Sequence, residues 1–180
     1  GEYYLWIKEP EKAKKALFQN AQYKDDLLAE ILRTDRLLYL FACYQLDEYK
    51  PAIAYLTNQL ILEPNTQDAL FYRAKSYMKV EQVELAEQDL TQLINLKDDY
   101  ILAHYYRAII RKDRENYVEA LADIHKSVQQ NPDDTNFLSL RGEIQEALGD
   151  SLAAKADYDR AINLKGTNIY EVLFKRGLLN

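Results

Sequence analysis

Side chains that could carry out chemistry are few in this chain, and their spacing does not assemble a reaction centre. His104 and His125 lie on different predicted helices, without the cysteine or histidine neighbours that a zinc site needs. The single cysteine, Cys43, cannot form an internal disulfide, and the five glycines never cluster into a phosphate-binding loop. We therefore expect no enzyme activity, no cofactor and no metal site. We interpret the histidines as ordinary helix residues and Cys43 as a small hydrophobe.

A more specific pattern joins arginines to aspartates. Three arginines are each followed by an aspartate, and the spacing within the pair is the same in all three cases. The arginines are Arg73, Arg107 and Arg141, and the aspartates are Asp89, Asp123 and Asp157. A planar guanidinium can hold a carboxylate through two parallel hydrogen bonds, so the spacing fits a ladder of structural ion pairs between packed helices. The alternative is a ligand-binding role, which we favour less because a ligand rarely needs the same pair at every recurrence.

Composition limits the classes of protein and partner. Only five glycines and four prolines in 180 residues favour long helices with short connections over a sheet with many turns. The formal charge is −6, with 23 basic and 29 acidic residues, so we expect no nucleic-acid partner. The longest apolar run, from Leu37 to Tyr44, is far short of the roughly 20 residues that cross a bilayer, so we expect no membrane insertion.

The cellular compartment is less constrained. A single cysteine fits a reducing compartment, and we expect a cytoplasmic location. Because the chain begins at Gly1 and not at methionine, an extracytoplasmic location after removal of an upstream signal peptide stays open.

The elements that hold these residues follow an internal period of about 34 residues. Four columns share the period: unit boundaries, buried small residues, bulky apolar residues, and small residues that directly follow the arginines. The boundaries are Pro64, Asp98, Pro132 and Gly166; the small residues are Ala52, Ala86, Ala120 and Ala154; the bulky residues are Leu56, Leu90, Ile124 and Tyr158; and the residues after the arginines are Ala74, Ala108 and Gly142.

This pattern resembles the tetratricopeptide repeat, whose units carry Leu, Gly, Tyr, Ala, Phe and Pro at fixed positions. The resemblance implies an all-α fold, a right-handed superhelical solenoid of antiparallel helix pairs with atypical terminal helices. It implies four units, at residues 33–66, 67–100, 101–134 and 135–168. Residues 1–32 are then an N-terminal helical segment, with a degenerate leading repeat as the alternative interpretation, and residues 169–180 are a C-terminal capping helix or the start of a fifth unit. The third unit departs from the pattern at Arg111, where an aromatic residue is usual.

The connections also fit paired helices of about 14 residues each. Residues 46–48 and 148–150 should end the first helix of a pair, and Gly149 can adopt the left-handed backbone conformation that a helix end often needs. Pro64 and Pro132 should begin the breaks between units, because a proline there cannot continue the preceding helix.

The resemblance also implies a binding surface. In this family the first helix of each repeat lines a concave face, with fixed positions pointing inward. In the first three units these positions combine aromatic and apolar residues with lysines, whereas the fourth unit is polar and acidic, with Asn136, Ser139, Glu143, Glu146 and Ala147. Our predicted partner-binding groove consists of Phe41, Tyr44, Phe71, Lys75, Lys79, Tyr105, Ile109 and Lys112. The alternative is that the aromatic residues fill a tightly wound superhelix or pack against the N-terminal helices.

One subclass of the family can be weighed directly. Co-chaperone repeats that hold the C-terminal carboxylate of heat-shock chaperones carry lysine and asparagine at three inward positions. Those positions hold Leu37, Phe41 and Tyr72 here, so we expect no binding of chaperone tails of that kind.

The sequence therefore predicts a non-catalytic protein–protein interaction scaffold whose partner is unknown. An extended or helical segment of the partner would place apolar side chains against Phe41, Phe71 and Tyr105, and Lys75 and Lys79 would favour acidic residues. The alternative is a structural or weakly self-associating module that uses the N-terminal helices, or a small secretion-type chaperone. An enzyme would require a catalytic domain outside these residues.

Overall fold

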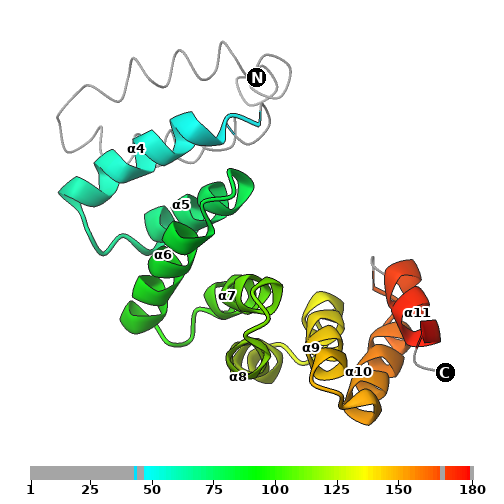
Figure 1. Ribbon diagram of the computed structural model, residues 1–180. Helices are drawn as coiled ribbons and strands as arrows, with labels where there is room; N and C mark the ends of the chain where they lie inside the picture. The colour runs from blue at the N-terminus through cyan, green and yellow to red at the C-terminus, as the bar shows by residue number, and fades with distance from the viewer. Residues whose placement is uncertain (1–42, 44–46, 167–168, 179–180) are drawn as a thin grey trace, which may run out of the picture. The chain divides into compact units, whose positions relative to one another are not determined.

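The computed structural model describes Cys43, residues 47–166 and residues 169–178, and every regular element in that part of the chain is an α-helix. The chain divides into two compact units, residues 1–82 and 83–180. The helices are α4 (Tyr49–Leu62) and α5 (Gln67–Lys79) in the first unit, and α6 (Val83–Leu96), α7 (Ile101–Asp113), α8 (Tyr117–Gln130), α9 (Thr135–Ala147), α10 (Ser151–Asn163) and α11 (Ile169–Leu178) in the second (Figure 1).

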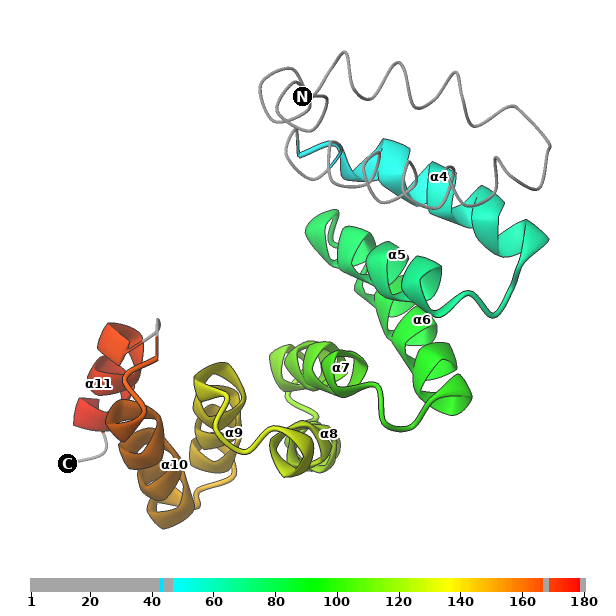
Figure 2. The ribbon, with the colours of Figure 1, turned by 180° about the vertical axis from the view of Figure 1, so that it is seen from behind.

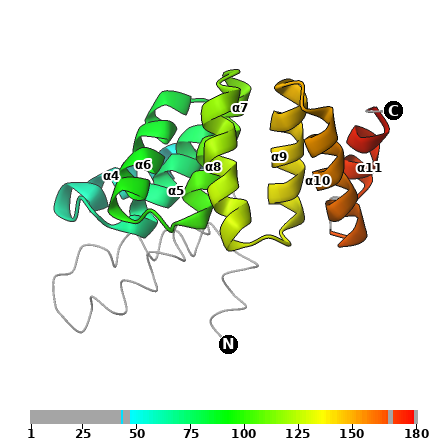
Figure 3. The same ribbon diagram turned by 90° about the horizontal axis from the view of Figure 1, so that it is seen from below.

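Within each of the two compact units, helices that follow one another in the chain also pack against one another. In the first unit α4 packs on α5. In the second unit α6 packs on α7, α7 on α8, α8 on α9, α9 on α10 and α10 on α11. Figures 2 and 3 show α9, α10 and α11 lying side by side in chain order. This arrangement confirms the predicted all-α array of helical repeats, in which each element is stabilised by its sequence neighbours.

The repeated columns of the sequence form the core of each unit. The small residues Ala52, Ala86, Ala120 and Ala154 are completely buried, and the bulky residues four positions later are buried as well. At the second small column, a β-carbon added to Gly142 would lie only 2.5 Å from Cε1 of Tyr158. Glycine therefore lets α9 approach α10 closely enough for the tyrosine ring to pack between them.

The turn between the two helices of a pair has a recurring backbone conformation. Gly149 has a φ angle of +84°, as predicted for a left-handed position. Asp47, Glu81 and Glu115 occupy the same column in the preceding repeats, and their φ angles are 54°, 60° and 62°. The left-handed turn is thus a property of the repeat, and only the last of these four turns uses the residue that adopts it without steric cost.

The ends of the helices agree with the helix boundaries predicted from the sequence. Helix α4 ends at Leu62 and α8 at Gln130, each just before one of the predicted proline breaks. At the start of α9, the Asp134 carboxylate accepts hydrogen bonds from the backbone N–H groups of Asn136 and Phe137, at 2.9 and 3.2 Å. Such N-caps satisfy donors that the first helical turn leaves unpaired.

Several predictions concern residues outside the described part of the chain. The proposed N-terminal helical segment 1–32 and the groove residues Phe41 and Tyr44 belong to this group. Cys43 is described and is completely buried, in agreement with its interpretation as a small hydrophobe. Among the described helices, none combines the length and the apolar character that a membrane span requires.

Candidate functional site

A pocket of about 240 Å³ opens in the second unit at positions that the repeat assigns to the inward surface. Three of its residues come from the predicted groove, namely Tyr105, Ile109 and Lys112 on α7. The structure brings them together with residues of α9 and α11; these are Asn136, Ser139, Leu140, Glu143 and Glu171. The third and fourth repeats therefore contribute to one site, even though the fourth has the more polar sequence.

Tyr105, the aromatic residue of this pocket, packs against other aromatic rings. The ring centroids of Tyr105 and Phe137 are 4.9 Å apart, and Tyr106 lies edge-on to Tyr105 at 5.2 Å. Tyr105 and Ile109 are half-buried and pack against the core of the unit. Burial, together with nearby groups such as Tyr106 and Asp134, raises the pKa of Tyr105 to about 12, so the phenol is uncharged at neutral pH. A rigid aromatic surface of this kind offers contact area at little entropic cost.

Charged side chains also line this pocket. The Glu143 carboxylate accepts hydrogen bonds from Lys112 Nζ at 2.7 Å and from Lys175 Nζ at 2.6 Å. Lys175 on α11 also donates to Glu171, and Lys112 Nζ lies 3.7 Å from the Asp113 carboxylate. Both lysines are therefore held by carboxylates within the unit.

The pKa values of this cluster reflect the same contacts. Burial alone would raise the pKa of Glu143, but hydrogen bonds and positive charge from Lys112 and Lys175 lower it below its usual value. Burial would lower the pKa of Lys175, but the hydrogen bonds and charges of Glu143 and Glu171 raise it. The charged forms of Glu143 and Lys175 are consequently the ones present at neutral pH.

The other described groove residues lie on α5 in the first unit. Phe71 is only 5% exposed, and Lys75 Nζ lies 5.6 Å from the centroid of its ring. Lys79 is exposed. The burial of Phe71 favours packing over partner contact for that ring, which is the alternative raised for the aromatic residues.

The predicted arginine–aspartate ladder is confirmed for the two pairs within the second unit. Arg107 donates from Nε and Nη2 to Asp123 at 2.8 and 2.7 Å. Arg141 donates in the same way to Asp157 at 2.7 and 2.6 Å. Both are two-pronged pairs between the helices of one repeat, the geometry that makes a guanidinium–carboxylate bond strong. The third predicted pair has one member in each compact unit, so the same comparison does not extend to it.

The third repeat enlarges its ion pair into a network. Arg111, which stands where the family usually has an aromatic residue, donates to Asp123 at 2.9 Å and to Glu87 on α6 at 3.1 Å. Glu87 also accepts from Arg114 at 2.9 Å. The departure from the family pattern at Arg111 thus has a structural reason, because the guanidinium links carboxylates of α6 and α8.

His104 belongs to the same network. Its side chain is buried, with Nδ1 at 3.2 Å from Asp123 Oδ1 and Nε2 at 2.8 Å from the carbonyl oxygen of Asp98. Burial would raise the pKa of Asp123, but the hydrogen bonds from His104 and Arg107 and the charges of Arg107 and Arg111 lower it. His104 is therefore a structural helix residue, as predicted.

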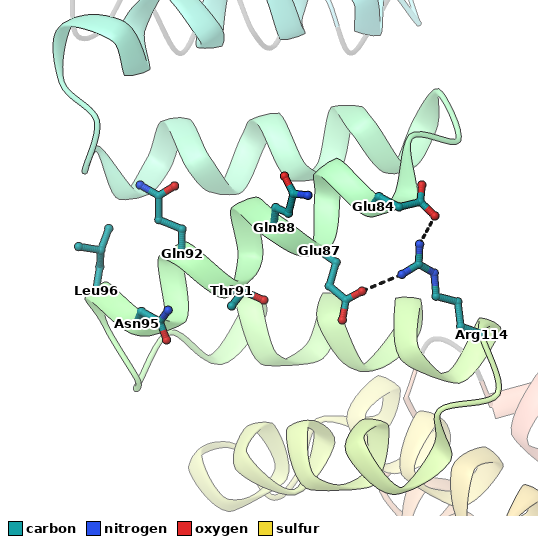
Figure 4. Close-up of a pocket in the computed structure, with 8 residues that line it drawn as sticks. All are labelled: Glu84, Glu87, Gln88, Thr91, Gln92, Asn95, Leu96 and Arg114. Carbon is teal, nitrogen blue, oxygen red and sulfur yellow. Dashed lines mark hydrogen bonds and ion pairs between the residues drawn. The ribbon is translucent and has the colours of Figure 1, made fainter.

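A second and larger hollow, of about 640 Å³, runs along α6 (Figure 4). It is lined by Glu84, Glu87, Gln88, Thr91, Gln92, Asn95, Leu96 and Arg114. Figure 4 shows Arg114 reaching back to both glutamates, so its charge is compensated there. Most of the lining residues are amides and charged side chains, and Leu96 is the one apolar residue among them.

Two sets of contacts were not anticipated from the sequence. Arg73 donates to Thr57 at 3.3 Å in the first unit, and Arg107 donates to Thr91 at 3.2 Å in the second. Thr57 and Thr91 stand at the same position of successive repeats, so the internal period contained this signal. The contacts of Glu143 with Lys112 and Lys175 join neighbouring repeats and follow no repeated column.

Among the described residues, no three His, Cys, Asp or Glu side chains lie close enough together to hold a metal ion.

No family model matches the chain. Sperm-associated antigen 1 of Homo sapiens is 30% identical over 106 residues, a region that covers 58% of this chain but only 11% of that protein.

Solved structures give a broader likeness. A tetratricopeptide repeat protein from Parabacteroides merdae superposes with a TM-score of 0.76 at 16% identity, covering 99% of this chain and 69% of that one. The first repeat domain of RPAP3, solved with an HSP90 peptide, gives a TM-score of 0.59 at 22% identity, covering 63% and 89%. The repeated columns, the paired helices and these likenesses together show that the chain is a protein of the tetratricopeptide-repeat fold.

Proposed function

We propose that this chain is a non-catalytic interaction module that holds a segment of a partner protein in the pocket formed by α7, α9 and α11. The observation that carries the proposal is the convergence of Tyr105, Ile109 and Lys112 with residues of α9 in one hollow. Repeat arrays commonly use the surface of their first helices to bind extended or helical segments. Lys75 and Lys79, which lie on α5 in the first unit, remain predicted groove residues.

The dimensions and chemistry of the pocket suit a side chain of a peptide. A hollow of about 240 Å³ accommodates one side chain of moderate size, and its lining combines Tyr105, Ile109 and Leu140 with polar and charged side chains. Asn136 is exposed and supplies amide groups for backbone hydrogen bonds. Ligand sites typically combine apolar lining residues with a few polar groups that fix the orientation of the ligand.

The fold supports protein binding in general, and it does not by itself specify one ligand. RPAP3 shows that a first repeat domain of this fold can hold a peptide, here one from HSP90. In the third and fourth units, the positions that hold lysine and asparagine in carboxylate-binding repeats hold Tyr105, Ile109 and Leu140. All three line the pocket, so an apolar side chain fits this place better than a terminal carboxylate.

Selection of short random peptides on the purified chain would test the proposal. Selected peptides are then titrated against the wild type and against Asn136→Trp, in which an indole at the rim blocks the pocket without removing a buried side chain. The expected result is at least a tenfold loss of affinity, because one blocked anchor of this size corresponds to roughly 1.5–3 kcal/mol.

Val118→Trp is the matched control, since Val118 is 69% exposed on α8 and does not line the pocket. It should bind the same peptides with unchanged affinity. Equal binding by wild type, Asn136→Trp and Val118→Trp would refute the pocket as the binding site.

The alternative function, self-association, was predicted for N-terminal residues that lie outside the described part of the chain. Sedimentation of the wild type at several concentrations would detect it as an increase in mass.

A further inference from the structure

We propose that the segment held in this pocket carries a lysine or arginine next to its apolar anchor. This inference rests on the proposed function and adds the chemistry of the partner to it. It follows from how the charged side chains around the pocket are paired and from which of them face solvent.

The cations of the site are already engaged. Lys112 and Lys175 both donate to Glu143, and Lys175 donates to Glu171 as well. Only 26% of the Lys112 side chain and 21% of the Lys175 side chain are exposed. An acidic residue of a partner could reach these ammonium groups only by competing with carboxylates that the unit itself supplies, at the cost of desolvation.

Two of the carboxylates paired with these lysines are much more exposed than the lysines themselves. The side chains of Glu171 and Asp113 are 63% and 64% exposed, so each presents oxygen atoms to solvent. Around the pocket two lysines face three carboxylates, those of Glu143, Glu171 and Asp113, which leaves an excess of negative charge. The chain as a whole has a formal charge of −6, so its long-range field has the same sign.

A cationic partner residue can therefore pair with an exposed carboxylate oxygen while the ion pairs within the unit remain formed. Its head group would pair with Glu171, which lines the pocket, or with Asp113 beside Lys112, while the neighbouring apolar side chain occupies the space between Tyr105 and Leu140. Charges at the rim of an interface mainly affect specificity and association rate, and each contributes less than a desolvated apolar anchor. The apolar anchor thus sets the affinity, and the acidic rim selects the sequence around it.

Peptide selection on two charge variants tests the inference. The rim variant, Glu171→Gln with Asp113→Asn, removes the exposed charges beside Lys175 and Lys112, and the control variant, Glu119→Gln with Asp99→Asn, removes two charges at exposed positions away from these lysines. Peptides selected on the wild type and on the control variant should be enriched in Lys or Arg beside an apolar residue. Peptides selected on the rim variant should lose that enrichment.

Titration of one selected peptide and of its twins then gives the magnitude. Replacing its cation by Gln should weaken binding about three- to fivefold, and replacing it by Glu should weaken binding further, the range expected for one exposed ion pair. The rim variant should bind the peptide and its Gln twin almost equally. If the selected peptides depend on Asn136 but are acidic or uncharged, the inference is overturned and the proposed function stands. If no peptide is affected by Asn136→Trp, both are overturned.

Discussion

The helix pairs α7–α8 and α9–α10 contain the same ion pair in different surroundings. In α7–α8, Asp123 accepts from Arg107, from Arg111 at 2.9 Å and lies 3.2 Å from His104 Nδ1. In α9–α10, Asp157 accepts two hydrogen bonds from Arg141, and the positions that correspond to His104 and Arg111 hold Leu138 and Gln145. Both carboxylates pair with an arginine, but only the third repeat adds Arg111 and His104 around its carboxylate, whereas the fourth has an apolar and a neutral residue at those two positions.

The apolar columns differ in a complementary way. The third repeat packs Ala108 against a helix that carries Ile124, whereas the fourth packs Gly142 directly on the ring of Tyr158. The larger aromatic residue on α10 is accommodated because the facing position has lost its β-carbon. Volume is therefore conserved between the two columns even though neither residue is, as close packing in a protein interior requires.

Some features of the packing recur in both repeats, and others differ between them. The small residues, the bulky residues and the arginine–aspartate pair recur because they set the distance between two helices. The residues around them vary in charge and size, but they vary together. Exchanging a single residue between repeats should consequently be harmful, whereas exchanging a matched set should not.

Removing the carboxylate should have the largest effect, and it should differ between the repeats. Asp123→Ala leaves two guanidinium groups and a buried imidazole facing an empty position, which should lower the free energy of unfolding by about 3–5 kcal/mol. Asp157→Ala leaves one guanidinium, for which we expect a loss of about 2 kcal/mol. Urea unfolding followed by circular dichroism measures both.

Glu119→Ala is the control for these two variants, because Glu119 is exposed on α8 and should change the free energy of unfolding by less than about 0.5 kcal/mol. A loss at Asp157 equal to or larger than that at Asp123 would contradict the role assigned to the network around His104 and Arg111.

Gly142→Ala should have the next largest effect. The added β-carbon would lie 2.5 Å from Tyr158 Cε1, and relieving that overlap should reduce the free energy of unfolding by about 1–3 kcal/mol. Adding Tyr158→Ile recreates the alanine–isoleucine combination of the third repeat and should recover much of the loss. A double variant no more stable than Gly142→Ala would show that the two columns do not compensate each other.

Acid should weaken the network around Asp123 by a smaller amount. The pKa of Asp123 is lowered in the folded chain, so its ionised form contributes stability above the unfolded pKa of about 3.9, and this contribution is lost as the pH falls through the folded value. The stability difference between wild type and Asp123→Asn should therefore be constant from about pH 5 to 8 and shrink below about pH 4. A difference that stays constant down to about pH 2 would mean that the carboxylate charge is not what stabilises the network.

Much of the fold could be predicted from the sequence because the information is repeated. The small and bulky columns, the arginine–aspartate pairs within the second unit and the left-handed turn at Gly149 all follow from one internal period and elementary packing.

The candidate site was predicted only in part. Tyr105, Ile109 and Lys112 do line one pocket, but the pairing of Lys112 with Glu143 occurs in one place and leaves no periodic trace. Phe71 lies at an inward position and is nevertheless buried, because burial depends on neighbours that a position in a repeat does not specify.

The turn that joins the two helices of a pair allows a single residue to be exchanged between repeats, and this exchange should change the free energy of unfolding least. Glu115 and Gly149 occupy the same position, with φ angles of 62° and 84°, and a side chain with a β-carbon pays about 1–2 kcal/mol for that conformation. Glycine avoids this steric cost but loses more entropy on folding, so the net gain of Glu115→Gly should be about 0.5–1 kcal/mol. Gly149→Glu should destabilise the chain by a similar amount, because only the backbone conformation is unfavourable: nothing lies within 4 Å of the position where the β-carbon would be.

Thermal and urea unfolding of the two single variants and of the exchanged pair measure the effect, and the exchanged pair should be as stable as the wild type. If Glu115→Gly is destabilising, the Glu115 side chain stabilises its turn by more than its backbone conformation costs, and the left-handed column would then be maintained by side-chain contacts and not by the geometry of the repeat.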